Sequence, residues 1–181
     1  MQFCTLGLTV ALLGFTAFVR ADEPLPPPER FVACSTSGLV CADSDPKTGR
    51  TVILRKAEAK VLWSIAGWHR WLFASNDGAS LVVAYDGLNL IPVASTLQLE
   101  VLRFYNRGKL VRTVRLADLY DDRSELVSTT SHLAWVNTIS ASQEDHLIVE
   151  LVSGRTETFS MATGQLFRGR ERTATRDDGE R

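Results

Sequence analysis

Trp68 to Gly87 reads WHRWLFASNDGASLVVAYDG and carries the strongest structural signal in the chain. An apolar run ends at Asn76 to Gly78, which is a tight-turn signal because glycine accepts a positive φ. A second apolar run, Leu81 to Tyr85, follows and ends at another Asp-Gly pair. Two short apolar runs joined by such a turn predict an antiparallel β-hairpin.

The same pattern recurs without gaps at Trp135 to Gly154, WVNTISASQEDHLIVELVSG. Leu102 to Val111 also matches Thr158 to Phe167, with a shift of one residue. We interpret residues 61–116 and 126–167 as two copies of one unit, the first carrying an insertion around Leu88 to Gln98. Such a unit buries only part of its apolar surface alone and must stack on a neighbour. The identical pairs in the hairpins are Trp68/Trp135, Ala74/Ala141, Ser75/Ser142, Val82/Val149 and Gly87/Gly154.

Short apolar or β-branched runs separated by turn signals continue on both sides of this stretch, for example Thr51 to Arg55 and Lys109 to Leu116. This pattern predicts an all-β, antiparallel fold. It predicts two blade-like sheets, arranged as a partial propeller or a sandwich. One short helix at most is expected, over Ala117 to Asp122.

The repeated unit resembles a β-propeller blade, through SNDG…LVVAYDG followed by VLRFYNRGKLV. Trp68 to Gly87 also resembles stretches of uncharacterised exported bacterial proteins, a resemblance that implies no activity. Propellers have about four to eight blades, whereas this chain offers two and a partial N-terminal one over Arg30 to Ile65. The resemblance therefore implies a partial propeller, or one completed by oligomerisation.

Both ends of the chain differ in composition from the middle. Residues 1–21 are mostly apolar and end in Val-Arg-Ala, which predicts a secretory signal peptide. An uncleaved anchor is the alternative, because no Lys or Arg precedes the apolar run. Residues 22–29 are a proline-rich linker, residues 30–167 the β-rich domain, and residues 168–181 a charged tail expected to be disordered. The mature chain is then expected to be periplasmic or extracellular, without a transmembrane span.

Composition limits the function classes. The chain has 20 basic and 21 acidic residues, so a nucleic-acid partner is not expected. Cys34 and Cys41 flank a Ser37-Gly38 turn, and an oxidising compartment favours a disulfide between them over two buried thiols. The third cysteine, Cys4, lies inside the predicted signal peptide.

Candidate binding residues form two groups. The tryptophans Trp63, Trp68 and Trp71 surround His69, and clustered aromatic rings can stack on sugars or bind a partner. Core packing is the simpler interpretation of Trp63 and Trp71, so Trp68 is expected to be the most exposed. Arg103 and Arg107 belong to a basic hairpin that either meets an anionic partner or is a solvated edge.

No spacing of His, Cys or acidic residues suits a metal, and no cofactor motif is present. Catalytic residues are not identified, because no nucleophile motif is found. The sequence thus favours an exported, non-catalytic β-domain that binds a protein or cell-envelope component, using strand edges and the loop Leu88 to Thr96. Two alternatives stay open. One is a small extracytoplasmic hydrolase or carbohydrate-binding protein that uses Trp63, Trp68, His69 and Trp71. The other is a homo-oligomer completing a propeller.

Overall fold

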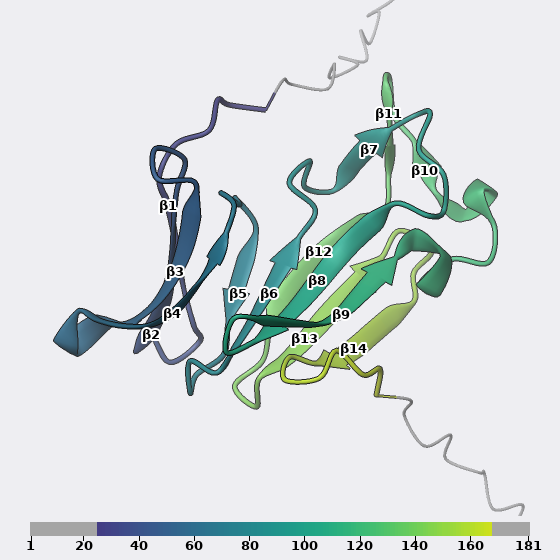
Figure 1. Ribbon diagram of the computed structural model, residues 1–181. Coiled ribbons are helices and arrows are strands. Elements are labelled where there is room, and N and C mark those ends of the chain that lie inside the picture. The colour runs from purple at the N-terminus through teal and green to yellow at the C-terminus, as the bar shows by residue number, and fades with distance from the viewer. Residues whose placement is uncertain (1–24, 168–181) are drawn as a thin grey trace, which may run out of the picture.

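The computed structural model describes residues 25–167. The predicted signal peptide, the start of the predicted linker and the predicted tail lie outside the described residues. Between them the chain forms antiparallel sheets (Figure 1), which confirms the all-β fold class. Helical structure is limited there to three one-turn 3₁₀ helices, where the sequence predicted one short helix. They are η1 (Lys56–Glu58), η2 (Leu116–Asp118) and η3 (Arg123–Glu125).

Four sheets make up the described chain. Two have four strands: sheet I, in the order β1-β2-β3-β4, and sheet II, in the order β5-β6-β8-β9. Sheet III has three strands, β12-β13-β14, and a small sheet pairs β10, β11 and β7. Their bounds are β1 Phe31–Cys34, β2 Val40–Asp45, β3 Arg50–Arg55, β4 Lys60–Ala66, β5 Leu72–Ala74, β6 Ser80–Ala84, β7 Leu90–Pro92, β8 Glu100–Asn106, β9 Lys109–Arg115, β10 Val127–Ser128, β11 His132–Ala134, β12 Val136–Ala141, β13 His146–Leu151 and β14 Thr156–Ser160.

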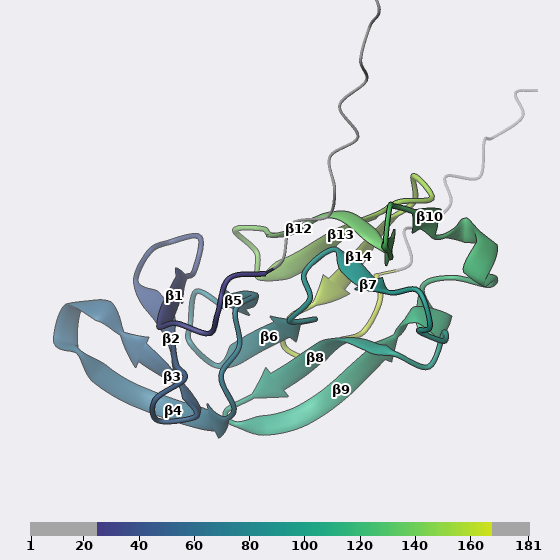
Figure 2. The ribbon, with the colours of Figure 1, turned by 90° about the horizontal axis from the view of Figure 1, so that it is seen from above.

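The three larger sheets stack with sheet II in the middle, as Figure 2 shows. On β6, Leu81 and Val83 belong to the core shared with sheet I, while Val82 and Ala84 belong to the core shared with sheet III. Every residue of β6 is buried. In a strand that is covered on both faces, apolar residues need not alternate with polar ones. This explains the unbroken apolar run of β6 in the first copy.

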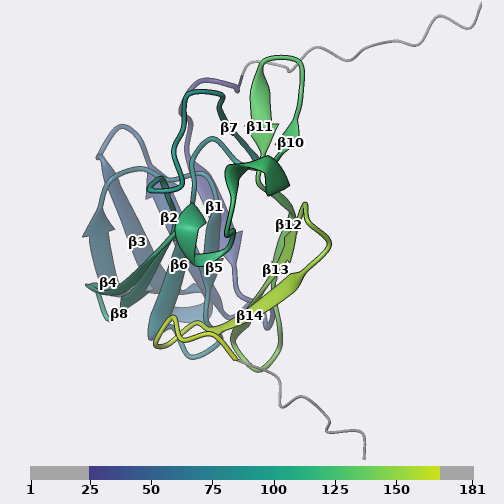
Figure 3. The ribbon, with the colours of Figure 1, turned by 90° about the vertical axis from the view of Figure 1, so that its right-hand side faces the viewer.

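The segment before the first copy is a complete sheet. Sheet I contains β4, which opens the first predicted copy but hydrogen-bonds to β3. The insertion after Gly87 supplies β7, which pairs with β11 just before the second hairpin; Ile91 lies opposite Leu133, and both are buried. Figure 3 shows this small sheet at one end of the stack.

One turn recurs in all three stacked sheets, at Ser35–Gly38, Ser75–Gly78 and Ser142–Asp145. In each, the fourth residue donates its backbone N–H to the serine carbonyl and has a positive φ. In each, the serine hydroxyl also accepts a backbone N–H from the following strand. The first hairpin is therefore a third copy of the motif that the sequence showed twice.

The three turns are hydrogen-bonded to one another through Asn76. Its side-chain oxygen accepts the backbone N–H of Ser37 at 2.8 Å, and its amide nitrogen donates to the Gln143 carbonyl at 3.0 Å. Its own backbone N–H donates to Asp145 Oδ1 at 2.8 Å. Asn76 thus fixes the position of sheet II relative to both neighbours at this end of the stack.

Cys34 and Cys41 form a disulfide across the β1–β2 hairpin, as the sequence predicted. They lie directly opposite in the antiparallel register, with Cα atoms 3.9 Å apart. The bond therefore ties the edge strand of sheet I to its neighbour.

Candidate functional site

Trp68 lies in the connection between β4 and β5, where the chain passes from sheet I to sheet II. Its indole Nε1 donates to the Glu29 carbonyl at 2.7 Å. The Arg70 guanidinium lies over the indole, 4.9 Å from the ring centroid, and donates to the Pro26 carbonyl at 3.0 Å. The two side chains therefore hold the proline-rich segment against the domain.

A pocket of about 300 Å³ opens beside Trp68. Its lining is mainly apolar, because proline rings, aromatic rings and one leucine provide most of the surface. Phe31 on β1 is 38% exposed and forms part of it. The lining residues are Pro26, Pro27, Glu29, Phe31, Trp68, Arg70 and Leu88.

Leu88 is held in place by the second repeated tryptophan. The indole of Trp135, which is fully buried, donates to the Leu88 carbonyl at 2.7 Å. Leu88 has φ 59°, a left-handed conformation that costs a non-glycine residue about 1 kcal/mol or more. Trp68 and Trp135 thus use their indole N–H in the same way, each binding a carbonyl of an upstream segment.

His69 lies beneath this region and is 6% exposed. Its Nδ1 is 3.3 Å from Asp86 Oδ2, and its backbone N–H donates to the Ser44 hydroxyl at 2.7 Å. A β-carbon at Gly67 would lie 2.8 Å from the imidazole Nε2, so that nitrogen faces Gly67. His69 is therefore part of a polar junction between sheets I and II and does not line the Trp68 pocket.

Trp71 and Trp63 are half-buried, and both side chains contact interior parts of the domain. Trp71 packs against Phe73 and edge-on to Trp135, with ring centroids 6.4 and 6.3 Å apart. The Trp63 indole donates to the Gly78 carbonyl at 2.7 Å and so joins sheet I to a turn of sheet II. The structure therefore separates Trp68 from the other tryptophans of its cluster.

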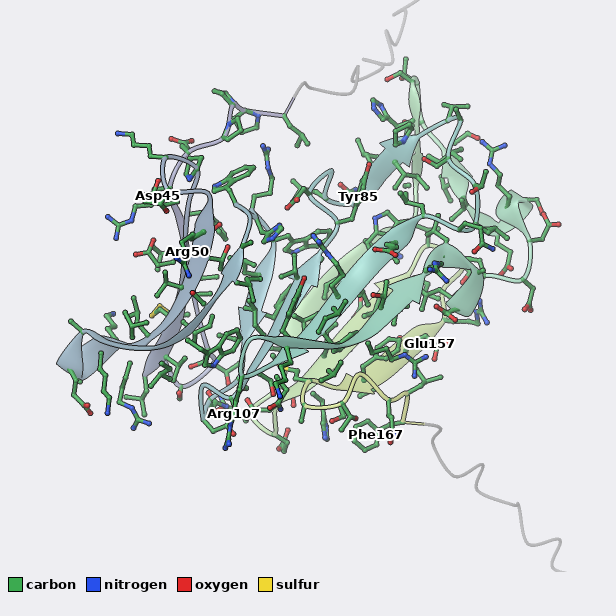
Figure 4. All side chains as sticks on the ribbon, in the orientation of Figure 1. Asp45, Arg50, Tyr85, Arg107, Glu157 and Phe167 are labelled. Atoms are coloured by element: carbon green, nitrogen blue, oxygen red, sulfur yellow. A yellow bond between two sulfur atoms is a disulfide. The ribbon has the colours of Figure 1, made fainter. Side chains whose placement is uncertain are left out.

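Arg103 and Arg107 line different hollows. Arg107 lies at the tip of the β8–β9 hairpin (Figure 4). The Arg103 hollow is also lined by Tyr85, which lies toward the opposite end of sheet II in the same figure. The Arg107 hollow measures about 490 Å³ and includes Arg55, Trp63 and Asp77. The Arg103 hollow measures about 190 Å³ and includes Asp86 and Glu100.

Asp77 balances part of the positive charge near Arg107. Burial raises the pKa of its carboxyl, but the Ser75 hydroxyl and the Ala79 backbone N–H, at 2.6 and 2.8 Å, together hold the pKa below its ordinary value. Asp77 is therefore a carboxylate near neutral pH. This hollow combines two guanidinium groups, one carboxylate and an indole face.

Sequence reasoning missed three parts of the Trp68 pocket. The proline segment looked like a free linker, Arg70 was not distinguished from other surface arginines, and Leu88 was only the start of a loop. The recurring tryptophan was the available signal, because it marks the residue that binds an upstream carbonyl in both copies.

Residues 25–167 contain no cluster of three or more His, Cys, Asp or Glu that could hold a metal ion. The same residues include no helix with the length and apolar character needed to cross a membrane.

No protein-family model matches the chain. No curated protein matches it either. Among solved structures, it is similar to the β-propeller domain of Cps50 (Swd1) from Myceliophteria thermophila, with 14% identity and a TM-score of 0.38, over 76% of this chain and 39% of that chain. Hydrazine synthase from Kuenenia stuttgartiensis matches with the same identity, TM-score and coverage of this chain, over 35% of its own length. The chain thus spans well under half of either protein.

Proposed function

We propose that this protein is an exported, non-catalytic binding domain that takes an apolar segment of a protein or cell-envelope partner into the Trp68 pocket. The observation that carries the proposal is the pocket itself: a mainly apolar hollow with an aromatic ring and a fixed leucine beside it. Recognition sites in proteins commonly combine such a surface with a few oriented polar groups.

The chemistry of the pocket supports binding over hydrolysis. Its described lining contains no hydroxyl or thiol side chain and a single carboxylate, Glu29, whereas glycoside hydrolysis uses a pair of carboxyl groups. His69, which the hydrolase alternative needs, is 6% exposed, with its Nε2 facing Gly67 and its Nδ1 near Asp86. The Cys34–Cys41 disulfide supports export, because such bonds persist in oxidising compartments. N-terminal sequencing of the mature protein tests the export step.

The binding step is tested with two matched leucine truncations. Leu88 lines the pocket, whereas Leu110 on β9 is 53% exposed and does not line it. A partner captured from cell-envelope extracts by the wild-type chain should be lost with Leu88→Ala and Trp68→Ala and kept with Leu110→Ala. Capture that survives both pocket substitutions, in folded variants, would refute the proposal.

A second candidate function is structural, and the smaller size of sheet III favours it. Among residues 25–167, sheets I and II have four strands and sheet III has three, and a single bridge, Phe159 to Leu166, continues sheet III beyond β14. Unpaired strand edges accept further strands, so a second copy is the occupant to test. Light scattering that finds only monomers at high protein concentration removes this candidate.

A further inference from the structure

Two carbonyl groups of the proline segment accept hydrogen bonds from two neighbouring side chains. Trp68 binds the carbonyl of Glu29 and Arg70 binds that of Pro26. A polyproline II helix has three residues per turn and no internal hydrogen bonds. In that conformation, carbonyls three residues apart point in the same direction and are free to accept external donors.

The donors are arranged to match that repeat. The guanidinium of Arg70 lies over the indole ring of Trp68, so one stacked pair presents two N–H donors. An aromatic ring beside proline rings is the surface on which proline-rich segments dock, because these segments are already extended and lose little entropy on binding. Pro26 and Pro27 line the remaining hollow, which leaves room beside the segment.

We propose that Trp68 and Arg70 form a reader of proline-rich polyproline II segments, with Pro26–Glu29 as the resident ligand and a proline-rich segment of the partner as the ligand that replaces it. Phe31, Trp68, Arg70 and Leu88 remain as the walls of the pocket when the resident segment is displaced. This inference rests on the proposed binding function and names the partner's chemistry. The donors contact backbone carbonyls, so the reader selects the backbone conformation that proline enforces. The resident segment is covalently attached, at an effective concentration of about millimolar, and an incoming segment must compete with it.

The test uses a fluorescently labelled peptide, LPPPER, which copies residues 25–30, and a control peptide with alanine in place of each proline. Anisotropy titrations compare the full wild-type chain with the double variant Pro26→Gly, Pro27→Gly, which weakens the resident segment. We expect the double variant to bind LPPPER about tenfold more tightly than wild type does, and the control peptide at least tenfold more weakly than LPPPER. Adding Trp68→Phe, which keeps an aromatic ring but removes the N–H, should weaken LPPPER binding about tenfold.

Three results would overturn the reader: equal binding of the two peptides, no binding of LPPPER to the double variant at millimolar concentration, or no effect of Trp68→Phe. Unfolding transitions of each variant confirm that it is folded, and Arg70→Met in the double-variant background, which removes the guanidinium and leaves no N–H donor, provides a second loss-of-donor variant. If Leu88→Ala abolishes partner capture while LPPPER fails to bind, the reader is refuted and the proposed pocket function stands. If LPPPER binds but Leu88→Ala leaves partner capture unchanged, the proposed pocket function is refuted and the reader stands.

Discussion

Two glycines in matching positions of the repeat should respond very differently to the same substitution. Gly108 and Gly164 both close the turn after the third strand of their sheet, with φ values of 80° and 68°. An alanine in this left-handed region costs about 1–2 kcal/mol at either position. The atoms around the added β-carbon differ between the two positions, and this should make the losses of stability unequal.

A β-carbon at Gly108 would meet the Ser64 carbonyl oxygen at 3.4 Å, which is an ordinary contact. At Gly164 it would lie 2.8 Å from Arg112 Cβ and 3.0 Å from Phe104 Cδ2. The Arg112 atom is attached to the backbone of β9, and Phe104 is fully buried, so neither can move aside easily. Overpacking of this kind costs about 1–3 kcal/mol. We therefore expect losses of about 1–2 kcal/mol for Gly108→Ala and about 2–5 kcal/mol for Gly164→Ala.

Urea unfolding followed by circular dichroism measures both variants. The midpoint should fall more for Gly164→Ala, with an unchanged dependence on denaturant. Equal losses, or a smaller loss at Gly164, would refute the view that the end of sheet III packs tightly on sheet II at this point.

Three further outcomes are expected. Asn76→Ala removes the side-chain hydrogen bonds that join the three turns and should lower the free energy of unfolding by about 2 kcal/mol. Gln143→Ala keeps the backbone carbonyl that Asn76 binds, so it should lower the free energy of unfolding by less than about 0.5 kcal/mol. Thermal unfolding of the two variants measures the difference. Reducing the Cys34–Cys41 bond should cost about 2 kcal/mol, and a double Cys→Ala variant should be insensitive to reductant. Burial raises the pKa of Tyr120 to about 12 from 10.0. The stability that its protonated phenol contributes is therefore complete below pH 10 and is lost as the pH rises toward 12. An ultraviolet titration of the phenols should show an ionisation step at high pH that Tyr120→Phe removes.

The candidate site was less predictable than the fold, and its residues show why. Trp68 is identified by its repeat partner Trp135, so its special position could be inferred from the sequence. Arg70 adjoins it, but nothing local says that its guanidinium covers the indole. Pro26 and Leu88 come from distant segments, and only the packing of sheet I on sheet II brings both to the same pocket.

The sequence by itself determined the features that depend on neighbouring residues. Apolar runs and turn residues specify hairpins, because the strand period and the positive φ of a turn are local properties. The disulfide followed for the same reason, since Cys34 and Cys41 flank one turn. Tertiary structure alone decided that the N-terminal strands complete a four-stranded sheet stacked on sheet II, that His69 is buried, and that the proline segment lies on Trp68. These outcomes depend on which apolar face covers which, and that choice is made between segments far apart in the chain.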